Sequence, residues 1–357
     1  MPREQAPVES EIQVRGLQHA SSRKSMNMST YDSIALECLA SVVEEGSFER
    51  AAKKQFISQS AVSQRISSLE AQVGQPLVLR SRPIQPTSAG QLLLKYTKLL
   101  RLLRSDLGQD LRQLSTSSTA STGHQDHISI AVDADSMATW MRPALASIKN
   151  KDHLLELFAD DLFQTGNQLH EGKVHGCVTA MEEPPLRCRT ELLGAWEYVA
   201  VAAPGFVSRH FTEGLELRRL QRLPFVAFNR RDDLSMRFMS NTLGLPQVRL
   251  NQVFIPSYQG RLDAVLEGWG VGIFPKKLIS AQLEQHLLID VVPNYAMSVP
   301  MYWHCWNFES EVLDKLSYAI RTTAAKWLLP ASKLPMAENP RSTSNLKESF
   351  FLSTRQI

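Results

Sequence analysis

Aspartate pairs follow several apolar runs in the second half of the chain, at points where strands are predicted to end. Asp133 and Asp135 follow the run ISIAV, and Asp160–Asp161 and Asp232–Asp233 follow later runs. Ligands in open α/β sheets bind beyond the carboxyl ends of the strands, and carboxylates gathered there favour a cationic ligand. The helix that begins near Ser136 has amides at its start that suit a ligand carboxylate. These residues together predict a site for a basic amino acid such as arginine or lysine.

Helix capping is the simpler interpretation of each aspartate pair. Aspartate is a preferred N-cap residue, so a single pair at a strand-to-helix junction fits a cap better than a ligand contact. The ligand hypothesis depends on all three pairs meeting in one cleft. Both interpretations remain open at the level of the sequence.

A second set of residues with binding chemistry lies in the helix predicted to begin after Ser58. Its apolar positions follow helical spacing and Gly74 ends it, while its exposed face carries mostly serine and glutamine. Glutamine pairs with two atoms of adenine, arginine with two atoms of guanine, and serine reaches bases or phosphates. A solvated helix face is the alternative, but such a face would use more glutamate and lysine. The residues predicted here to contact DNA are Gln59, Ser60, Ser63, Gln64 and Arg65.

The helices that precede this one complete a predicted helix-turn-helix. One helix is expected over 31–45, where Gly46 ends it, and a second over 48–55, where Ser47 caps it. Two helices joined by a turn of three or four residues form this motif. Between residues 50 and 82 the sequence has six basic residues and one acidic residue, which suits double-stranded DNA as a partner. Lys53 is counted among the predicted DNA contacts.

A short β wing is predicted after the helix-turn-helix. Prolines at 76, 83 and 86 surround the β-rich stretch LVLR, which favours two short strands over a helix. Arg80 and Arg82 are expected beside the phosphate backbone, where they contribute affinity and register rather than sequence preference. Thr87 is placed to cap the next helix.

A long helix is predicted over 91–115. Its apolar residues recur every three or four positions, as in a coiled coil, which favours a homodimer or homotetramer held together by this helix. Packing of the same stripe on its own domain is the alternative. The residues of the stripe are Leu92, Tyr96, Leu99, Leu103, Leu107, Leu111 and Leu114. Residues 115–126 are of low complexity and read as a flexible linker.

Strand and helix patterns alternate from residue 127 onward and predict two α/β lobes with a cleft between them. One continuous helix is expected over 136–149 and another over 162–171. The apolar run at 301–306 and a last helix over 311–329 are expected to return to the first lobe. The predicted strands of the two lobes lie at 128–132, 154–158, 174–180, 197–203, 224–228, 248–255 and 271–275.

The composition argues against several other classes of protein. The four cysteines lack metal or redox spacing, which indicates a cytoplasmic location, and no apolar run of the length of a membrane span occurs. His124 and His127 lack a third metal ligand, and no nucleophile elbow or phosphate loop occurs, so no metal, cofactor or enzyme activity is expected. Oxidation sensing by Cys177 and Cys188 is the alternative, although a cysteine within an apolar strand is more often buried and inert.

Three motifs in the first ninety residues resemble those of LysR-type transcriptional regulators. They are QSAVSQRISSLE at 59–70, GQPLVLR at 74–80 and PTSAG at 86–90. The resemblance implies an N-terminal all-α winged helix-turn-helix followed by a two-lobed α/β effector domain like that of periplasmic binding proteins. It also implies promoter DNA and RNA polymerase as partners.

The later segments are similar to one branch of that family, the ArgP and LysG regulators of arginine and lysine export. They are SIAVDADSMATWMRPAL, AWEYVAVAAPGF, PFVAFNRRDDL and MYWH, and the similarity extends with gaps over 31–328. This resemblance implies activation of an exporter gene when basic amino acids accumulate. It adds Trp140 to the candidate effector residues Asp135, Ser136, Asp160, Asp161, Asp232 and Asp233. The chain departs from the pattern in EEPPLRCR (182–189), in parts of the second lobe and in its N-terminal extension.

Five segments are expected along the chain. Residues 1–29 are polar and expected to be disordered, and Met26 and Met28 offer alternative starts. A winged helix-turn-helix domain at 30–90, a linker helix and flexible linker at 91–126 and an effector domain at 127–332 follow. Residues 333–357, rich in proline, serine and asparagine, are expected to form a disordered tail.

Overall fold

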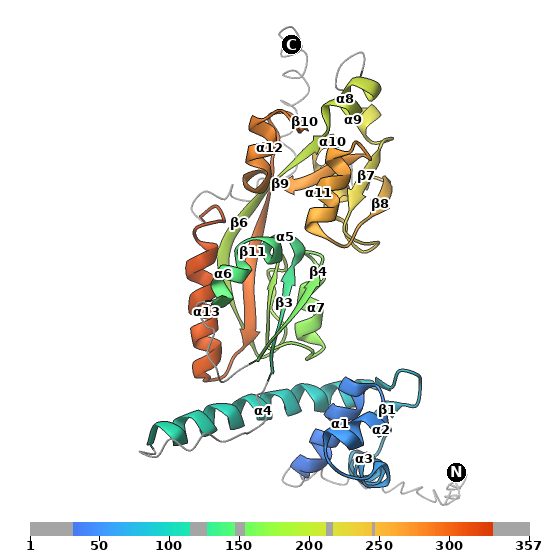
Figure 1. Cartoon of the computed structure of the whole chain (residues 1–357), viewed down its shortest axis with the longest axis vertical. Coiled ribbons are helices and arrows are strands. Elements are labelled where there is room, and N and C mark those ends of the chain that lie inside the picture. The colour runs from blue at the N-terminus through green and yellow to red at the C-terminus, as the bar shows by residue number, and fades with distance from the viewer. Residues whose placement is uncertain (1–30, 115–126, 147–153, 212–216, 245–246, 331–357) are drawn as a thin grey trace, which may run out of the picture.

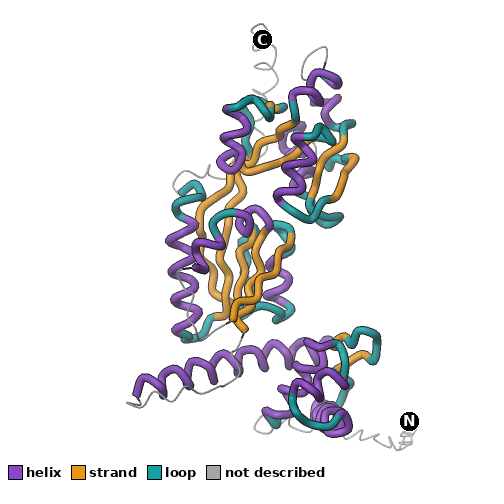
Figure 2. Tube along the Cα trace, in the orientation of Figure 1, coloured by secondary structure: helices purple, strands orange, loops and turns teal. Residues whose placement is uncertain are grey.

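The computed structural model describes residues 31–114, 127–146, 154–211, 217–244 and 247–330. A small helical domain, a long helix and a two-lobed α/β domain follow one another along the chain (Figures 1 and 2). The segments predicted to be disordered or flexible, at 1–29, 115–126 and 333–357, lie outside the described residues. No helix in the described ranges combines the length and the apolar character that a membrane span requires.

Three short helices form the core of the N-terminal domain. Side chains of Asp32, Ser47 and Ser58 accept hydrogen bonds from backbone amides of the helices that follow them, as N-caps do. Gly46 and Gly74 take the left-handed conformation just after the first and third helices, where a residue with a side chain is disfavoured. The predicted helix-turn-helix is therefore confirmed as α1 (Ser33–Glu45), α2 (Phe48–Lys54) and α3 (Gln59–Val73).

The predicted wing is present as two antiparallel two-residue strands. β1 (Val78–Leu79) pairs with β2 (Gln85–Pro86). Leu77 and Val78 are buried with the apolar residues of α1 and α3, so the wing is fixed to the helical core. Thr87 Oγ1 accepts from the amide of Gly90, which confirms its predicted role as a helix cap.

The long helix α4 (Ser88–Leu114) packs against both domains. Leu93 and Leu94 contact the core of the N-terminal domain, whereas Leu99 and Leu102 pack with the core of the C-terminal domain. Leu99 was predicted to belong to the exposed stripe, and this assignment is wrong, because the helix turns that residue toward its own C-terminal domain. The stripe that remains exposed consists of Leu92, Tyr96, Leu100, Leu103, Leu107 and Leu111.

The C-terminal domain is built on one continuous sheet in the order β4-β3-β5-β11-β6-β9-β7-β8, with β10 paired to β6. The strands near the β4 end are parallel to one another, as are those near the β8 end, and the middle strands run antiparallel. The strands are β3 (His127–Asp133), β4 (Leu154–Asp160), β5 (Gly176–Thr179), β6 (Cys188–Ala202), β7 (Pro224–Ala227), β8 (Asn251–Phe254), β9 (Val271–Pro275), β10 (Ile289–Asp290) and β11 (Met297–Trp306).

Two long strands, β6 and β11, connect the two lobes of this domain (Figure 1). Residues 188–198 of β6 pair with β11 in lobe 1, and residues 198–201 pair with β9 in lobe 2. Lobe 1 also contains β3–β5, α5 (Ala134–Ala138), α6 (Met141–Ala146), α7 (Thr165–His170) and α13 (Glu311–Ala324). Lobe 2 contains β7–β10, α8 (Pro204–His210), α9 (Leu217–Leu220), α10 (Leu234–Leu243), α11 (Tyr258–Leu266), the 3₁₀ helix η2 (Lys276–Ile279) and α12 (Ser280–Glu284).

The prediction of one helix over 136–149 is wrong in its described part, because the chain forms the two short helices α5 and α6. The backbone of Thr139 leaves the helical region between them, with φ −124° and ψ −93°. Proline inside a helix clashes with the carbonyl four residues earlier but is accepted in a first turn. Pro143 would meet the carbonyl of Thr139 in a continuous helix, and the restart at Met141 places it in a first turn instead. The prediction of two lobes, with β11 and α13 returning to the first, is confirmed.

Candidate effector pocket and DNA-binding surface

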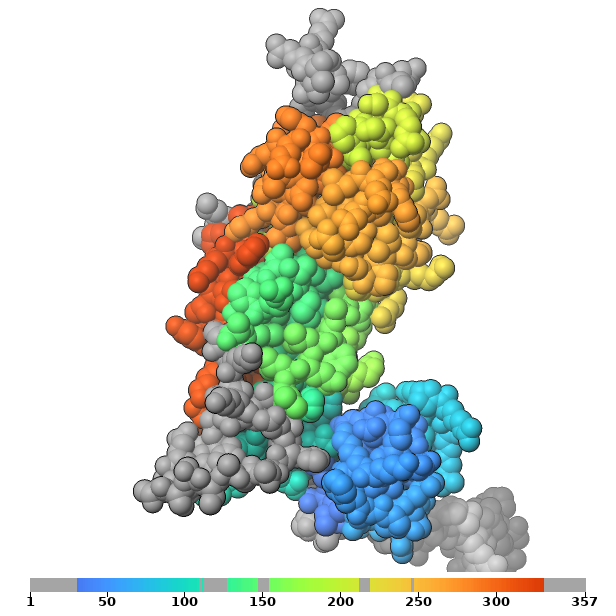
Figure 3. Space-filling view, viewed as in Figure 1, coloured from blue at the N-terminus to red at the C-terminus, as the bar shows by residue number. Residues whose placement is uncertain are grey.

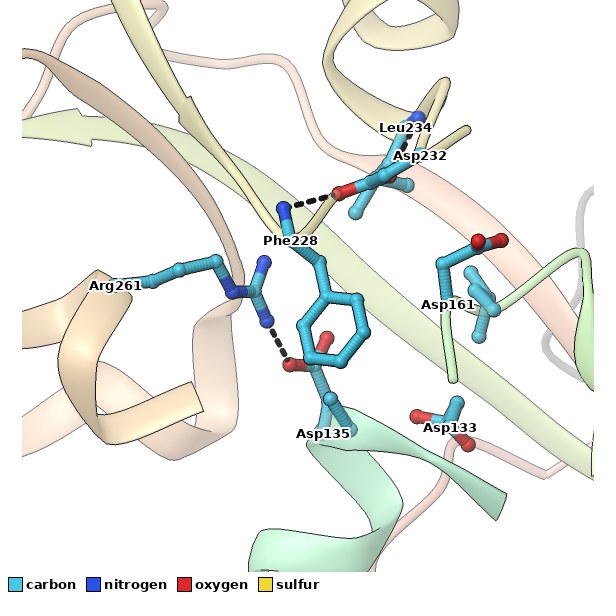
Figure 4. A pocket seen from close by; sticks show the side chains of 9 residues that line it. Asp133, Asp135, Asp161, Phe228, Asp232, Leu234 and Arg261 are labelled. Carbon is cyan, nitrogen blue, oxygen red and sulfur yellow. Dashed lines mark hydrogen bonds and ion pairs between the residues drawn. The ribbon is translucent and has the colours of Figure 1, made fainter. Parts of the chain in front are cut away.

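A small acidic pocket lies where the two lobes meet (Figure 4). Lobe 1 contributes the turn between β3 and α5 and the end of β4, and lobe 2 contributes the end of β7 and residues of α10 and α11. The cavity measures about 20 Å³, enough for about one water molecule, and the lobes meet on the face seen in Figure 3. An amino acid therefore enters only when the lobes separate. The pocket is lined by Asp133, Ala134, Asp135, Asp161, Leu162, Phe228, Asp232, Leu234 and Arg261.

A buried ion pair joins the lobes across this pocket. Arg261, on α11 of lobe 2, lies with its Nη2 2.6 Å from Oδ1 of Asp135, on α5 of lobe 1. The two side chains are only 4% and 6% exposed. The hydroxyl of Tyr198 donates to the other carboxylate oxygen of Asp135 at 2.9 Å. Both oxygens of Asp135 are therefore occupied by groups of the protein itself.

A second set of contacts links the lobes at the rim of the pocket. The side-chain amide of Asn229 donates to Asp160 at 3.4 Å and to Asp161 at 3.3 Å. Arg231 approaches Asp160 at 3.4 Å, but its side chain is 65% exposed, so this ion pair contributes little. In the contacts of Arg261 and Asn229 across the cleft, lobe 2 thus supplies the hydrogen-bond donor and lobe 1 the carboxylate.

The electrostatics of the pocket favour an additional cation. Burial, reinforced by the nearby Asp135 carboxylate, raises the pKa of Asp133 to about 7, and burial raises the pKa of Asp161 to about 6. Burial also raises the pKa of Asp232. Four carboxylates face one guanidinium, that of Arg261, so the lining carries a net charge of −3 when every group is ionised. A cation placed among them lowers these pKa values and makes the carboxylates better partners.

The predicted effector residues do not all reach this pocket. Asp135, Asp161 and Asp232 line it. Asp160 lies at the rim with Asn229 and Arg231, and Asp233 lies beside Arg237 of its own helix at 2.8 Å.

Ser136 and Trp140 are fully buried and absent from the pocket lining, which corrects their predicted placement. The amide of Ser136 donates to Asp133 Oδ1 at 2.9 Å, so the amide expected to bind a ligand carboxylate is already bonded as part of a helix cap. The indole of Trp196 donates to the Ser136 hydroxyl at 3.4 Å. Trp140 belongs to the apolar core.

Two charged residues of the pocket were missed as effector residues by the reasoning from sequence. Asp133 was recognised in an aspartate pair but not chosen as a contact, although it lies at the end of β3 beside the cavity. Arg261 was not considered, although a signal was available. It lies three residues after Tyr258 and four before Val265, which places a guanidinium on the apolar face of an amphipathic helix.

The predicted DNA contacts gather on α3 and the wing. Gln59, Ser60 and Gln64 are exposed and Ser63 is half-buried, whereas Arg80 and Arg82 are exposed on the wing. Lys53 forms an ion pair with Glu49 at 2.8 Å on α2. Arg65 is half-buried, with Nη1 3.9 Å from the sulfur of Cys38 on α1, so its guanidinium leans toward its own domain in this structure.

The helix α4 connects the N-terminal domain to lobe 1 by polar contacts as well as by packing. Arg101 lies 2.7 Å from Glu37 and 2.6 Å from Glu44, both on α1. Earlier in the same helix, Lys95 lies over the ring of Trp306 at 4.4 Å, and the hydroxyl of Tyr96 accepts from Arg187 at 2.8 Å. These contacts join lobe 1 to the helix that carries the N-terminal domain.

Cys177 and Cys188 lie on strands separated by an intervening strand. Cys177 of β5 faces His304 and Cys188 of β6 faces Trp306, both on β11. Two strand spacings amount to about 9.5 Å, beyond the Cα separation of about 7 Å that a disulfide spans. Burial also raises the pKa of Cys177, and it raises the pKa of Cys188 to about 11, so neither thiol is activated.

We therefore expect peroxide treatment of the folded chain to leave both cysteines as thiols. Thiol counting by mass spectrometry after alkylation, with and without peroxide, measures this directly. A denatured sample serves as a control for thiol reactivity. A Cys177–Cys188 disulfide formed in the folded chain would contradict the strand geometry.

Both parts of the chain match known protein families. Residues 34–91 match the bacterial regulatory helix-turn-helix protein of the lysR family, and residues 121–317 match the LysR substrate-binding domain. The chain belongs to the LysR family of DNA-binding transcriptional regulators, which pair a helix-turn-helix with an effector-binding domain.

Within this family the chain is similar to regulators named ArgP and LysG. It is 36% identical over 301 residues to ArgP of Pseudomonas fluorescens, covering 84% of this chain and 99% of that protein. The crystal structure of ArgP from Mycobacterium tuberculosis has a TM-score of 0.72 at 34% identity, over 84% of this chain and 99% of that one. Full-length LysG from Corynebacterium glutamicum with bound effector Arg has a TM-score of 0.63 at 30% identity, over 84% of this chain and 100% of that one.

Proposed function

We propose that this regulator responds to a basic amino acid, arginine or lysine, bound between the two lobes of its C-terminal domain. The observation that carries the proposal is the acidic pocket, in which four carboxylates face one guanidinium. A cationic side chain gains more from such a buried cluster than at a surface, because solvent screening is weak there. The relative LysG, described with bound effector Arg, supports the same ligand class.

The proposed regulated gene encodes an amino-acid exporter, and the regulator acts in the cytoplasm as an activator that recruits RNA polymerase to promoter DNA. Closure of the lobes on the ligand alters the position of α4, since lobe 1 packs on that helix. Ligand control of DNA binding requires different affinities in the two states, with a coupling of about 1–3 kcal/mol.

The target gene is identified by sequencing the genomic DNA fragments that the purified chain retains. Transcription of the gene next to the retained site is then measured before and after cells are loaded with arginine or lysine. We expect a transporter gene whose transcript increases and depends on this regulator. A retained site beside genes unrelated to transport, with transcripts that do not respond, would contradict the export role.

The proposed DNA-reading residues are those exposed on α3, with the wing arginines on the phosphate backbone. Gln64→Ala is expected to cost about 1–3 kcal/mol at the cognate site and to relax base preference there. Arg80→Ala is expected to weaken binding to all sequences alike and to reduce the salt dependence by about one counterion. Fluorescence anisotropy with cognate and scrambled duplexes at several salt concentrations separates the two. A sequence-selective loss in Arg80→Ala would contradict the wing assignment.

The exposed stripe of α4 is proposed to hold the chain together as a homodimer or homotetramer. A dimer with two-fold symmetry places two recognition helices on half-sites about 34 Å apart. The stripe holds large apolar side chains at three- and four-residue spacing, and Leu103 in its centre is 46% exposed.

Leu103→Glu is therefore expected to yield monomers, because it places a carboxylate in the apolar seam. Light scattering of the full chain after size exclusion reports the mass. Leu186→Glu, a similar change at an 82% exposed leucine outside the stripe, serves as the control and is expected to leave the mass unchanged. An unchanged mass in Leu103→Glu would place the dimer contact elsewhere.

A further inference from the structure

One carboxylate oxygen in the pocket stands apart from the others. Asp135 accepts from Arg261 and Tyr198, and Asp232 accepts from the backbone amides of Phe228 and Leu234. Asp161 has a hydrogen-bond donor on each of its two oxygens. Oδ2 of Asp133 is buried without a hydrogen-bond partner among the described residues.

The surroundings of Asp133 are not explained by its role as a helix cap alone. Its side chain is 1% exposed and lies beside the cavity at the end of β3 (Figure 4). Its other oxygen, Oδ1, accepts from the amide of Ser136, and the Ser136 hydroxyl and Asp135 amide also lower the pKa of this carboxyl, as donors at a helix cap do. A buried carboxylate oxygen without a donor is costly, and a ligand that supplies an N–H group removes the cost.

Arg261 decides which carboxylate remains available. Its guanidinium occupies the position beside Asp135 that a ligand guanidinium or ammonium would otherwise take, at 2.6 Å. Displacing Arg261 would leave that arginine buried without its partner, whereas Asp133 accepts a cation with no such loss. We propose that Asp133, and not Asp135, receives the cationic group of the effector, and that Arg261 determines this choice. The proposal rests on the proposed effector class.

Asp133→Asn tests this assignment with little risk to the fold. Asparagine is as good an N-cap as aspartate, so the contact to the Ser136 amide is retained. Affinity for arginine and lysine, measured by titration calorimetry on the full chain, is expected to fall by at least about 30-fold, as for loss of a buried charge partner. The thermal unfolding temperature is expected to stay the same or rise, because a repelled buried charge is removed.

Two control variants separate the contribution of Asp133 from that of its neighbours. Asp160→Asn removes the same charge at the rim, outside the pocket lining, and is expected to change affinity by less than about 3-fold. The double variant Asp135→Asn/Arg261→Gln removes both members of the ion pair with no net change of charge. It is expected to keep more affinity than Asp133→Asn does, because Asp133 remains.

Proton release provides a readout that a structural role would not change. Binding of a cation beside Asp133 lowers its pKa from about 7, so about half a proton is released per site at pH 7. Calorimetry in two buffers of different ionisation enthalpy counts it, and Asp133→Asn is expected to release almost none. The charged and titratable groups around Asp133 are Asp135 on its own segment, Asp161 from β4, Tyr198 from β6, and Asp232 and Arg261 from lobe 2.

Three results would overturn the inference. If Asp133→Asn binds arginine and lysine as tightly as the unaltered chain does, Asp133 is not the receptor. The same follows if the double variant loses binding while Asp133→Asn retains it. Arginine binding by the unaltered chain without proton release at pH 7 would also contradict it. Failure of the unaltered chain to bind either arginine or lysine is a different outcome, which would overturn the proposed effector as well.

Discussion

Arg261→Gln is expected to lower the free energy of unfolding of the C-terminal domain by about 3–5 kcal/mol, which is the largest stability effect that we predict. The arginine is buried with Asp135 as its ion-pair partner, and removing one member of a buried pair leaves an uncompensated charge in a weakly polar medium. The substitution also removes a cation from above the rings of Phe228 and Phe274. Denaturant unfolding followed by tryptophan fluorescence measures the change.

The double variant Asp135→Asn/Arg261→Gln is the matched comparison. With the partner charge also removed, most of the lost stability is expected to return, because the cost arises from the orphaned carboxylate rather than from the absent contact. A single variant within about 1 kcal/mol of the unaltered chain would show that the ion pair does not hold the lobes together.

Affinity for arginine is expected to fall by about 100-fold between pH 8 and pH 5.5. Asp133 and Asp161, with pKa values raised to about 7 and about 6, are ionised at pH 8 and increasingly protonated below neutrality. Protonated carboxylic acids do not attract a cation, so binding at low pH must expel protons and becomes weaker. The side chain of free arginine keeps its charge throughout this range. Calorimetric titrations at half-unit intervals of pH measure the profile.

A measurement of folding separates protonation of the carboxylates from a general loss of folding at low pH. The far-ultraviolet circular dichroism of the unliganded chain is expected to stay constant over the same range. Asp133→Asn serves as the matched variant, and its affinity, although lower, is expected to change by only about 4-fold, because the group with a pKa of about 7 is gone and Asp161, with a pKa of about 6, remains. Affinity that is independent of pH in the unaltered chain would contradict a site built from these two groups.

Much of the fold follows from short-range features of the sequence. The glycines at 46 and 74 occur where the backbone takes positive φ, and serines or aspartate precede the helices that they cap, so the first three helices were predicted to within two residues of their ends. The break near Thr139 was missed, because the prediction of one helix over 136–149 took no account of Pro143, a residue that a helix interior disfavours.

The site was less predictable, because it depends on contacts between residues far apart in the sequence. The aspartates at 135, 161 and 232 line the pocket, and their partners come from other segments. Arg261 lies 126 positions from Asp135, and no local pattern pairs them. Leu99 shows the same limit, because helical spacing places it on a stripe, whereas the position of lobe 1 decides that it is covered.

Titration calorimetry of the full chain with arginine, lysine and norleucine tests the central claim most directly. Norleucine has an apolar chain of similar length to that of lysine and the same backbone groups, so it isolates the contribution of the side-chain charge. We predict saturable binding of arginine or lysine and no binding of norleucine at the same concentrations. Norleucine bound as tightly as the basic amino acids, or no heat from any of the three, would contradict a pocket selected for a cationic effector.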